Sequence, residues 1–216
     1  LFVRHGARLA LFDIDEDALR PIAEELSAVP FQVDVSDVGA VNAAVDAAAA
    51  ALGGLDGVVN VAGILLSKPL EEITAEEQDR TLKVNLGGPT NVIRASLRHM
   101  REAGAGTIVN FSSYSGVRPG AGLSMYGASK AGLLALAQSL IYDIGPNIRI
   151  NSICPGVIET PMNQKRIDSG HLGDEAMKRI NQLQRRGKPE ELAEVALFLT
   201  CDESSFVSNA VIEASG

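Results

Sequence analysis

The sequence contains no tryptophan, few aromatic residues of any kind and only two cysteines. Cys154 and Cys201 match neither the spacing of a metal site nor that of a disulfide framework, so we expect a reducing, cytoplasmic setting. The three histidines are scattered along the chain without a ligand pattern. We therefore predict neither a metal ion nor a disulfide-stapled domain.

Long hydrophobic runs and an excess of basic residues are also missing. No apolar stretch approaches the roughly 20 residues that a membrane-spanning helix needs, and no signal peptide is visible. Acidic residues outnumber basic residues by 27 to 19, and the net charge is −8. Because like charges repel, we expect neither nucleic acid nor an anionic membrane as a partner.

Short apolar runs alternate with longer helical patterns along the chain. Runs typical of buried strands occupy residues 8–12, 31–33, 57–60, 107–111, 148–153 and 210–213. Helical spacing covers 15–26, a stretch from position 36 or 37 to 52, 74–100, a run headed by Tyr126, and 190–199. This alternation predicts βαβ units, and hence a doubly wound parallel sheet in a three-layer α/β/α arrangement. No linker interrupts it, so we expect one domain over residues 1–216.

Polar or turn-forming residues follow most of the predicted strands. They are Asp13, Asp34, Asn60, Ser113 and the pair Pro155 and Gly156. In parallel sheets ligands bind beyond the carboxyl ends of the strands, where these residues should meet. Their shared position predicts a binding site at that edge.

Three of the polar residues have a chemistry in common. Tyr126 and Lys130 are four apart at the head of a helical run, so they share one helix face. A nearby lysine cation lowers the pKa of a phenol, and about 2–3 units would bring the tyrosine near neutral pH. The hydroxyl of Ser113 can hold a substrate oxygen. Proton transfer at an alcohol or carbonyl is predicted, with a cofactor to accept the hydride.

Each residue also has an ordinary structural explanation. A Tyr–Lys pair on a helix is often surface decoration, and a serine after a strand is often a cap. Their combination with the other motifs decides between the two interpretations.

Five motifs in order give the sequence a family resemblance. They are residues 60–63 (NVAG), Asn85 within LKVNLGG, the set Ser113, Tyr126 and Lys130, residues 155–160 (PGVIET), and the pair Asp34 and Val35. Together they resemble the short-chain dehydrogenase/reductase family, of the kind that includes 3-oxoacyl-carrier-protein reductases and hydroxysteroid dehydrogenases. The resemblance covers nearly the whole chain.

The resemblance implies a Rossmann-like fold and a role for each matched residue. Tyr126 would be the general acid/base, and Lys130 would lower its pKa and bind the nicotinamide ribose. Ser113 would orient the substrate, and Asn85 would support a proton-relaying water. A helix asparagine that bonds a neighbouring backbone group is the alternative for Asn85. The implied cofactor contacts are Asp13, Ile14, Asp34, Val35, Asn60, Ala62, Gly63, Tyr126, Lys130, Pro155, Gly156, Ile158 and Thr160.

The residue expected to choose the cofactor is Asp13. Its carboxylate can accept hydrogen bonds from both hydroxyls of the adenosine ribose and would repel a 2′-phosphate. Residues 14–16 supply no arginine or lysine to compensate. NAD is therefore predicted rather than NADP, although a turn-forming aspartate is the plain alternative.

The sequence also departs from the family pattern. The first strand and the TGxxxGxG turn, which holds the pyrophosphate, do not occur in residues 1–216. We expect both upstream of Leu1, and we expect further tail residues after Gly216. Val207, Ser208 and Asn209 replace the usual ITG.

The predicted function is an NAD-dependent oxidoreductase that interconverts a secondary alcohol and a ketone. Loops 114–125 and 157–187 should form an apolar substrate pocket, with Arg118, Lys165 and Arg166 near it. The substrate stays open among a β-ketoacyl thioester, a steroid, a diol and a sugar. The net charge disfavours an acidic acyl carrier protein unless a local basic patch exists.

Two other functions remain open on the same fold. One is a non-catalytic dinucleotide sensor or scaffold, and the other is a sugar epimerase or dehydratase. The complete Ser–Tyr–Lys set disfavours the first, and the short chain disfavours the second. A homotetramer is expected from the family and from apolar faces on helices 82–100 and 131–144.

Overall fold

All 216 residues are described by the computed structural model. Six parallel strands form the centre: β1 Ala10–Asp13, β2 Val29–Gln32, β3 Gly57–Asn60, β4 Gly106–Phe111, β5 Ile148–Pro155 and β6 Val211–Ala214. All six predicted strands are present, with ends that differ by a few residues.

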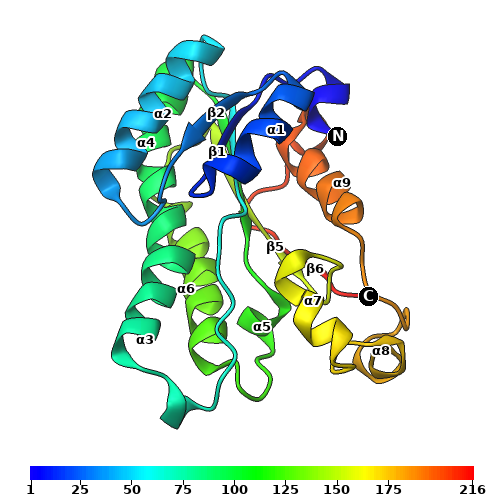
Figure 1. Cartoon of the computed structure of the whole chain (residues 1–216). Helices are drawn as coiled ribbons and strands as arrows, with labels where there is room; N and C mark the ends of the chain where they lie inside the picture. Colours follow the sequence, from blue (N-terminus) through cyan, green and yellow to red (C-terminus); the bar gives the residue numbers. More distant parts are fainter.

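Helices cover both faces of the strands. The α-helices are α1 Glu16–Leu26, α2 Val38–Leu52, α3 Ala75–Leu82, α4 Gly88–Ala103, α5 Tyr114–Val117, α6 Ser124–Leu140, α7 Pro161–Asp168, α8 Asp174–Ile180 and α9 Pro189–Thr200. Figure 1 shows α2, α4 and α6 on one side of the strands and α1 and α9 on the other. The expected three layers and Rossmann-like parallel arrangement are thus present. None of the helices is both long enough and apolar enough to span a membrane.

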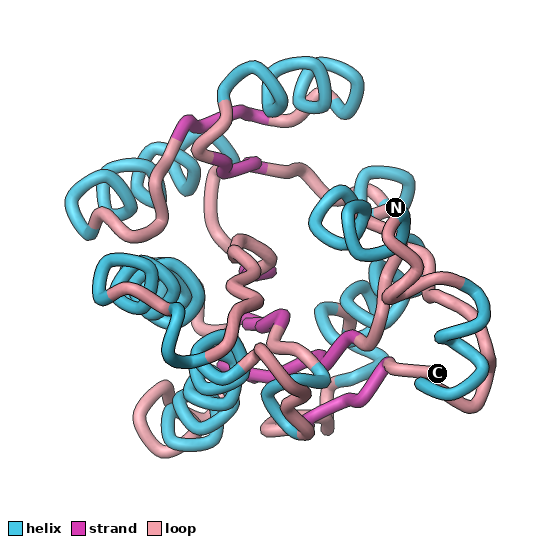
Figure 2. Tube along the Cα trace, turned by 60° about the horizontal axis from the view of Figure 1, so that its bottom comes forward, coloured by secondary structure: helices cyan, strands magenta, loops and turns pink.

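The strands form two hydrogen-bonded groups. β1 pairs with β2, and β3 to β6 pair in sequence order. Figure 2 shows the first pair apart from the other four strands. The inner edges of β1 and β3 therefore have no strand partner, which refines the expectation of one continuous sheet.

Strand β4 lies in the middle of the core. Its side chains alternate between the two faces of the sheet and so contact both helical layers. Ile108 packs with Ile93 and Ala137 from α4 and α6. Val109 faces the opposite way and packs with Leu192 from α9. Both β4 side chains are fully buried. This packing fixes the end of β4, where the polar residues of the site begin.

Side-chain caps set the starts of two helices beside the site. The Asp37 carboxylate accepts bonds from the backbone nitrogens of Gly39 and Ala40 at the start of α2. Thr74 and Glu77 form a capping box at the start of α3.

The predicted helix 74–100 is interrupted. A π-helical turn, η3 Lys83–Gly87, separates α3 from α4. The turn widens the helix and places Asn85 on the inside, where it is fully buried. A Cβ on Gly88 would lie 2.6 Å from the Cγ2 atom of Val35, so a glycine is needed there for close contact between α4 and the loop after β2.

Candidate active site

A cavity of about 640 Å³ opens at the carboxyl ends of β1, β2 and β3. Six of the expected cofactor residues line it: Asp13, Ile14, Asp34, Val35, Ala62 and Gly63. These residues come from three separate loops, which the parallel strands bring to one edge. We refer to this space as the first cavity.

Two carboxylates lie in the first cavity. One oxygen of Asp13 accepts a 3.0 Å bond from the backbone nitrogen of Asp15. One oxygen of Asp34 accepts bonds from the nitrogen and hydroxyl of Ser36, at 2.9 and 2.8 Å. Both side chains are exposed, and the second oxygen of each has no protein partner. Free carboxylate oxygens are suitable acceptors for ribose hydroxyls and an adenine amino group.

Another wall of the first cavity is formed by α3 and η3. Its charged side chains are Glu76, Asp79, Arg80 and Lys83. The sequence pattern did not mark these four residues as site residues. Their spacing of three and four marks one helix face, but it does not show that this face borders the cavity.

Asn85 ties the loop after β3 to helix α6. Its amide donates to the backbone oxygen of Ile64 at 2.9 Å and accepts from the backbone nitrogen of Ile64 at 2.8 Å. It also donates to the hydroxyl of Ser129 at 3.1 Å, and Ser129 donates to the backbone oxygen of Tyr126 at 2.7 Å. The contacts match the alternative that the sequence left open, an asparagine bonded to backbone.

Gly63 keeps a space open beside Lys130. A Cβ at this position would lie 3.2 Å from the Oδ1 atom of Asn85 and 3.3 Å from the Nζ atom of Lys130. These distances are shorter than ordinary contacts, so a larger residue would displace both groups. The glycine leaves room for a ligand next to the lysine.

The side chain of Asn60, which the family resemblance places among the cofactor contacts, instead bonds a neighbouring strand. Its amide donates to the Oδ1 atom of Asn110 at 2.8 Å and joins the ends of β3 and β4. The side chain is buried and does not line the first cavity. The Nδ2 atom of Asn110 has no protein partner and is buried.

Ser113 and Tyr126 line a second cavity, of about 610 Å³. Ser113 follows β4 and caps the short helix α5, accepting a 3.0 Å bond from the nitrogen of Ser115. Tyr126 lies in the first turn of α6. Burial raises the pKa of Tyr126, and the neighbouring Ser113 hydroxyl opposes this shift. The phenol is therefore protonated at neutral pH and can act as a proton donor.

Lys130 lies one helical turn beyond Tyr126 and is buried. Its ammonium donates a 2.8 Å bond to the backbone oxygen of Phe111. Burial lowers the pKa of Lys130 to about 8, partly offset by Cys154. Contrary to the sequence-based expectation, Lys130 does not lower the pKa of Tyr126 in this structure, because burial dominates the environment of the phenol.

The residues at the end of β5 and in the loop after it divide between two environments. Pro155 and Gly156 line the second cavity with Ser113 and Tyr126. The Ile158 side chain is instead buried against Leu192, so that only its backbone could contact a cofactor. Thr160 precedes α7 and makes no side-chain capping bond, which leaves its hydroxyl free.

The two cavities meet at one loop. Gly63 and Ile64 line the first, and Leu65 lines the second. The space that Gly63 leaves beside Lys130 lies at this junction. The two adjoining cavities leave an elongated space of the kind that an extended dinucleotide needs. The free carboxylate oxygens of Asp13 and Asp34 and the space beside Gly63 thus suit NAD(P).

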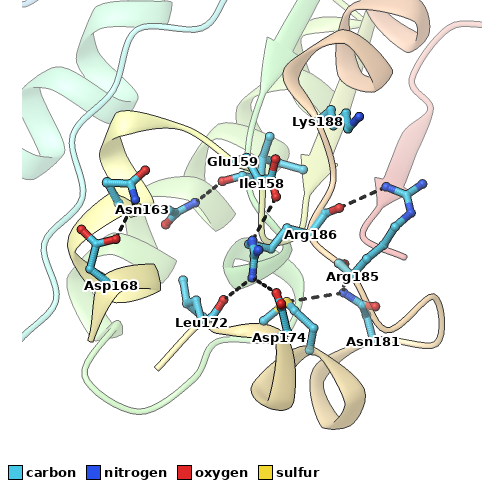
Figure 3. A network of polar contacts seen from close by, with 12 residues as sticks. Ile158, Glu159, Asn163, Asp168, Leu172, Asp174, Asn181, Arg185, Arg186 and Lys188 are labelled. Carbon is cyan, nitrogen blue, oxygen red and sulfur yellow. Dashed lines mark hydrogen bonds and ion pairs between the residues drawn. The ribbon is translucent and has the colours of Figure 1, made fainter. Parts of the chain in front are cut away.

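A polar network holds the outer wall of the second cavity (Figure 3). Arg186 donates to Glu159 at 3.1 Å and to the backbone oxygen of Leu172 at 3.1 Å, and it pairs with Asp174 at 2.8 Å. Its side chain is only 17% exposed. The arginine therefore joins the loop after β5 to the segment between α7 and α8. Leu172 itself lines the second cavity.

Comparisons with known proteins agree with this geometry. A family model described as Enoyl-(Acyl carrier protein) reductase matches residues 1–216. The 3-oxoacyl-[acyl-carrier-protein] reductase FabG of Chlamydia muridarum is 39% identical, over 100% of this chain and 89% of that protein. A cyclopentanol dehydrogenase of Comamonas sp. is 35% identical, over 100% of this chain and 88% of its own length.

Solved structures show the same fold. A short-chain dehydrogenase/reductase of Brucella melitensis, described as glucose/ribitol dehydrogenase, has a TM-score of 0.93 at 31% identity, covering 100% of this chain and 88% of its own. ElxO with NADP bound has a TM-score of 0.92 at 26% identity, covering 100% and 90%. A 7α-hydroxysteroid dehydrogenase complexed with NADH and a 7-oxo bile acid has a TM-score of 0.91 at 27% identity, covering 97% and 84%. The chain belongs to the short-chain dehydrogenase/reductase family, whose members are nicotinamide-dependent oxidoreductases.

Proposed function

We propose that the protein is an NAD-dependent oxidoreductase that interconverts a secondary alcohol and a ketone. The observation that carries the proposal is the position of Ser113 and Tyr126 on one cavity wall, with the Lys130 ammonium buried beside the junction of the two cavities. A dinucleotide sensor has no need of this set. No observation favours an epimerase or a dehydratase.

The proton chemistry follows from the protonation states of the site. When NADH is bound, it supplies a hydride to the carbonyl carbon of the ketone. Ser113 holds the carbonyl oxygen by a hydrogen bond, and the Tyr126 hydroxyl gives it a proton as negative charge develops. The product is the alcohol, and the tyrosine is left as a phenolate.

Lys130 and Asn85 complete the proposed proton path. Lys130 binds the nicotinamide ribose and stabilises the phenolate of Tyr126 once that charge has formed. The hydrogen bonds of Asn85 keep the loop around Ile64 against α6. The family resemblance alone supports its further role, in which Asn85 would support a water that returns a proton from solvent. Alcohol oxidation runs the same steps in reverse and needs the phenolate. It should therefore gain more from rising pH than ketone reduction does.

The preference for NAD over NADP rests on the charge of the first cavity. Four acidic and two basic residues line it, and Asp13 is the last residue of β1. A 2′-phosphate would add further negative charge to this surface, whereas ribose hydroxyls can donate to Asp13. Pro155, Gly156, the backbone of Ile158 and Thr160 would hold the nicotinamide.

For assembly and location, we propose a homotetramer in the cytoplasm. Apart from the family, the support is that large apolar side chains lie open on the surface, with Phe206 fully exposed and Phe198 about half exposed. Light scattering on the purified protein tests the assembly. A monomer at micromolar concentration would contradict it.

The test of the proposed function uses the full-length protein. NADH and NADPH are titrated by fluorescence, and a panel of neutral and charged ketones is then screened for consumption of the reduced cofactor. We expect tighter binding of NADH than of NADPH and turnover of at least one ketone. Binding of neither cofactor would contradict the proposal, and tight binding without turnover would favour the sensor.

A further inference from the structure

The charged side chains that line the second cavity are all positive. Arg118 and Arg166 are the charged residues of its wall, and no aspartate or glutamate contributes to it. A lining of this size at the average composition of the chain would include about two or three acidic residues. The side chains of the second cavity thus contribute positive charge only, in a protein whose net charge is −8.

The two arginines are available to a ligand. Eight ion pairs occur in the structure, and neither Arg118 nor Arg166 belongs to any of them. Neither guanidinium donates a hydrogen bond to another protein group, in contrast with Arg186 and Arg185 nearby. An unpaired guanidinium fork is suited to a carboxylate or a phosphate-like group.

Each arginine comes from a different wall. Arg118 follows α5, five residues after Ser113, and its guanidinium lies 5.9 Å from the centre of the Tyr114 ring. This stacking restricts the arginine to the side of the cavity that Tyr114 also lines. Arg166 lies in the last turn of α7 and is partly buried. Both arginines line the same cavity as Ser113 and Tyr126, so an anionic group that they bind would share that cavity with the reacting carbonyl.

We propose that the second cavity selects a ketone or alcohol that carries an anionic group, and that Arg118 and Arg166 bind that group. The inference rests on the proposed oxidoreductase function. The ligand is a small organic anion: its charge is a carboxylate or a tetrahedral phosphonate-like group, and its carbonyl lies a few bonds away. The anion fixes the orientation of the carbonyl toward Ser113 and Tyr126.

Matched substrates separate this inference from the proposed function. Acetoacetate and levulinate are compared with their methyl esters, which have the same ketone without the charge, and acetonylphosphonate tests a tetrahedral anion. We expect kcat/KM to be about tenfold or more higher for the anion than for its ester. The advantage should shrink as salt is added, because exposed charges are screened. Equal or better turnover of the esters would overturn the inference and leave the oxidoreductase intact.

Variants of the two arginines, compared with a control arginine, show which side chains bind the anion. Arg118→Gln and Arg166→Gln should each lower the ratio of kcat/KM for anion over ester by about tenfold. Arg179→Gln is the control, because Arg179 is an exposed, unpaired arginine on α8 that does not line the cavity. An unchanged ratio in both cavity variants, or an equal loss in the control, would overturn the inference.

Calorimetric titration of acetoacetate into the protein with saturating NADH adds a readout that needs no turnover. Binding that both cavity variants weaken supports the inference, even where no ketone is reduced. If acetoacetate does not bind and the anions are turned over no better than their esters, the inference is overturned. Failure of every ketone in the wider panel, neutral ones included, counts against the proposed function instead.

Discussion

The ammonium group of Lys130 donates a 2.8 Å hydrogen bond to the backbone oxygen of Phe111, the last residue of β4. The bond holds the lysine of α6 at the end of the central strand, beside the loop that carries Ser113. Burial lowers the pKa of this group to about 8, so its charge is close to titration under ordinary assay conditions. The cation that the proposed mechanism requires is held in place at a cost in stability.

That cost predicts a pH dependence. The folded pKa of about 8 is below the unfolded value near 10.4, so the folded protein binds fewer protons between these two values and gains stability as pH rises through them. The buried charge costs about 3 kcal/mol below pH 8, and the cost disappears above about pH 10.5. In urea unfolding, the stability of Lys130→Met relative to wild type should fall by about this amount between about pH 7 and pH 10. A pH-independent difference would contradict the account.

Gly63→Ala should weaken cofactor binding without unfolding the protein. The new Cβ would lie 3.2 Å from Asn85 and 3.3 Å from Lys130, so both polar groups would shift. We expect about a tenfold loss of NADH affinity by fluorescence titration. Gly39→Ala in α2 is the control, because its Cβ would meet only the side chain of Asp37 at 3.4 Å. Unchanged affinity in Gly63→Ala would show that the space beside Lys130 is not used.

Asp13→Asn should reduce the preference for NADH over NADPH. The asparagine keeps an oxygen for the backbone nitrogen of Asp15 and removes only the charge that repels a 2′-phosphate. We expect the ratio of the two dissociation constants to move about tenfold toward NADPH. Asp34→Asn removes a charge from the same cavity and should affect both cofactors alike. If the two variants change the ratio equally, Asp13 is not the selecting residue.

Arg186→Met should loosen the outer wall of the second cavity. The change removes the contacts to Glu159, Asp174 and the backbone oxygen of Leu172 (Figure 3). We expect faster hydrogen exchange in residues 169–177 and a KM for the ketone about three- to tenfold higher. Arg185→Met is the control, since its pair with Glu191 is half exposed and lies outside this contact set. Identical hydrogen exchange in the two variants would show that the contacts of Arg186 do not hold residues 169–177 in place.

The sequence predicted the parts of the site that depend on strand ends and helix spacing. Asp13, Asp34 and Ser113 line the cavities because parallel strands bring their carboxyl ends to one edge, and Tyr126 joins them from the first turn of α6. Gly6 ends the first helical turn, Phe2–His5, with a φ of 87°, the left-handed conformation that favours glycine at a helix end.

What could not be predicted depends on burial and helix packing. The π-helical turn brings Asn85 into contact with Ile64 and Ser129, which are distant in sequence. The raised pKa of Tyr126 reflects the amount of surface that surrounding loops remove from water. The wall formed by Arg80 and Lys83 required the position of α3 relative to β1. No local pattern encodes these relationships.

The most direct test of the central claim is the turnover of Tyr126→Phe at saturating NADH with a ketone that the wild type reduces. The phenylalanine retains the ring but removes the proton that the carbonyl oxygen needs. We predict that kcat falls by about a hundredfold to ten-thousandfold, while the dissociation constant of NADH stays within about twofold. Retained turnover would contradict the assignment of Tyr126 as the general acid/base, and with it the proposed mechanism.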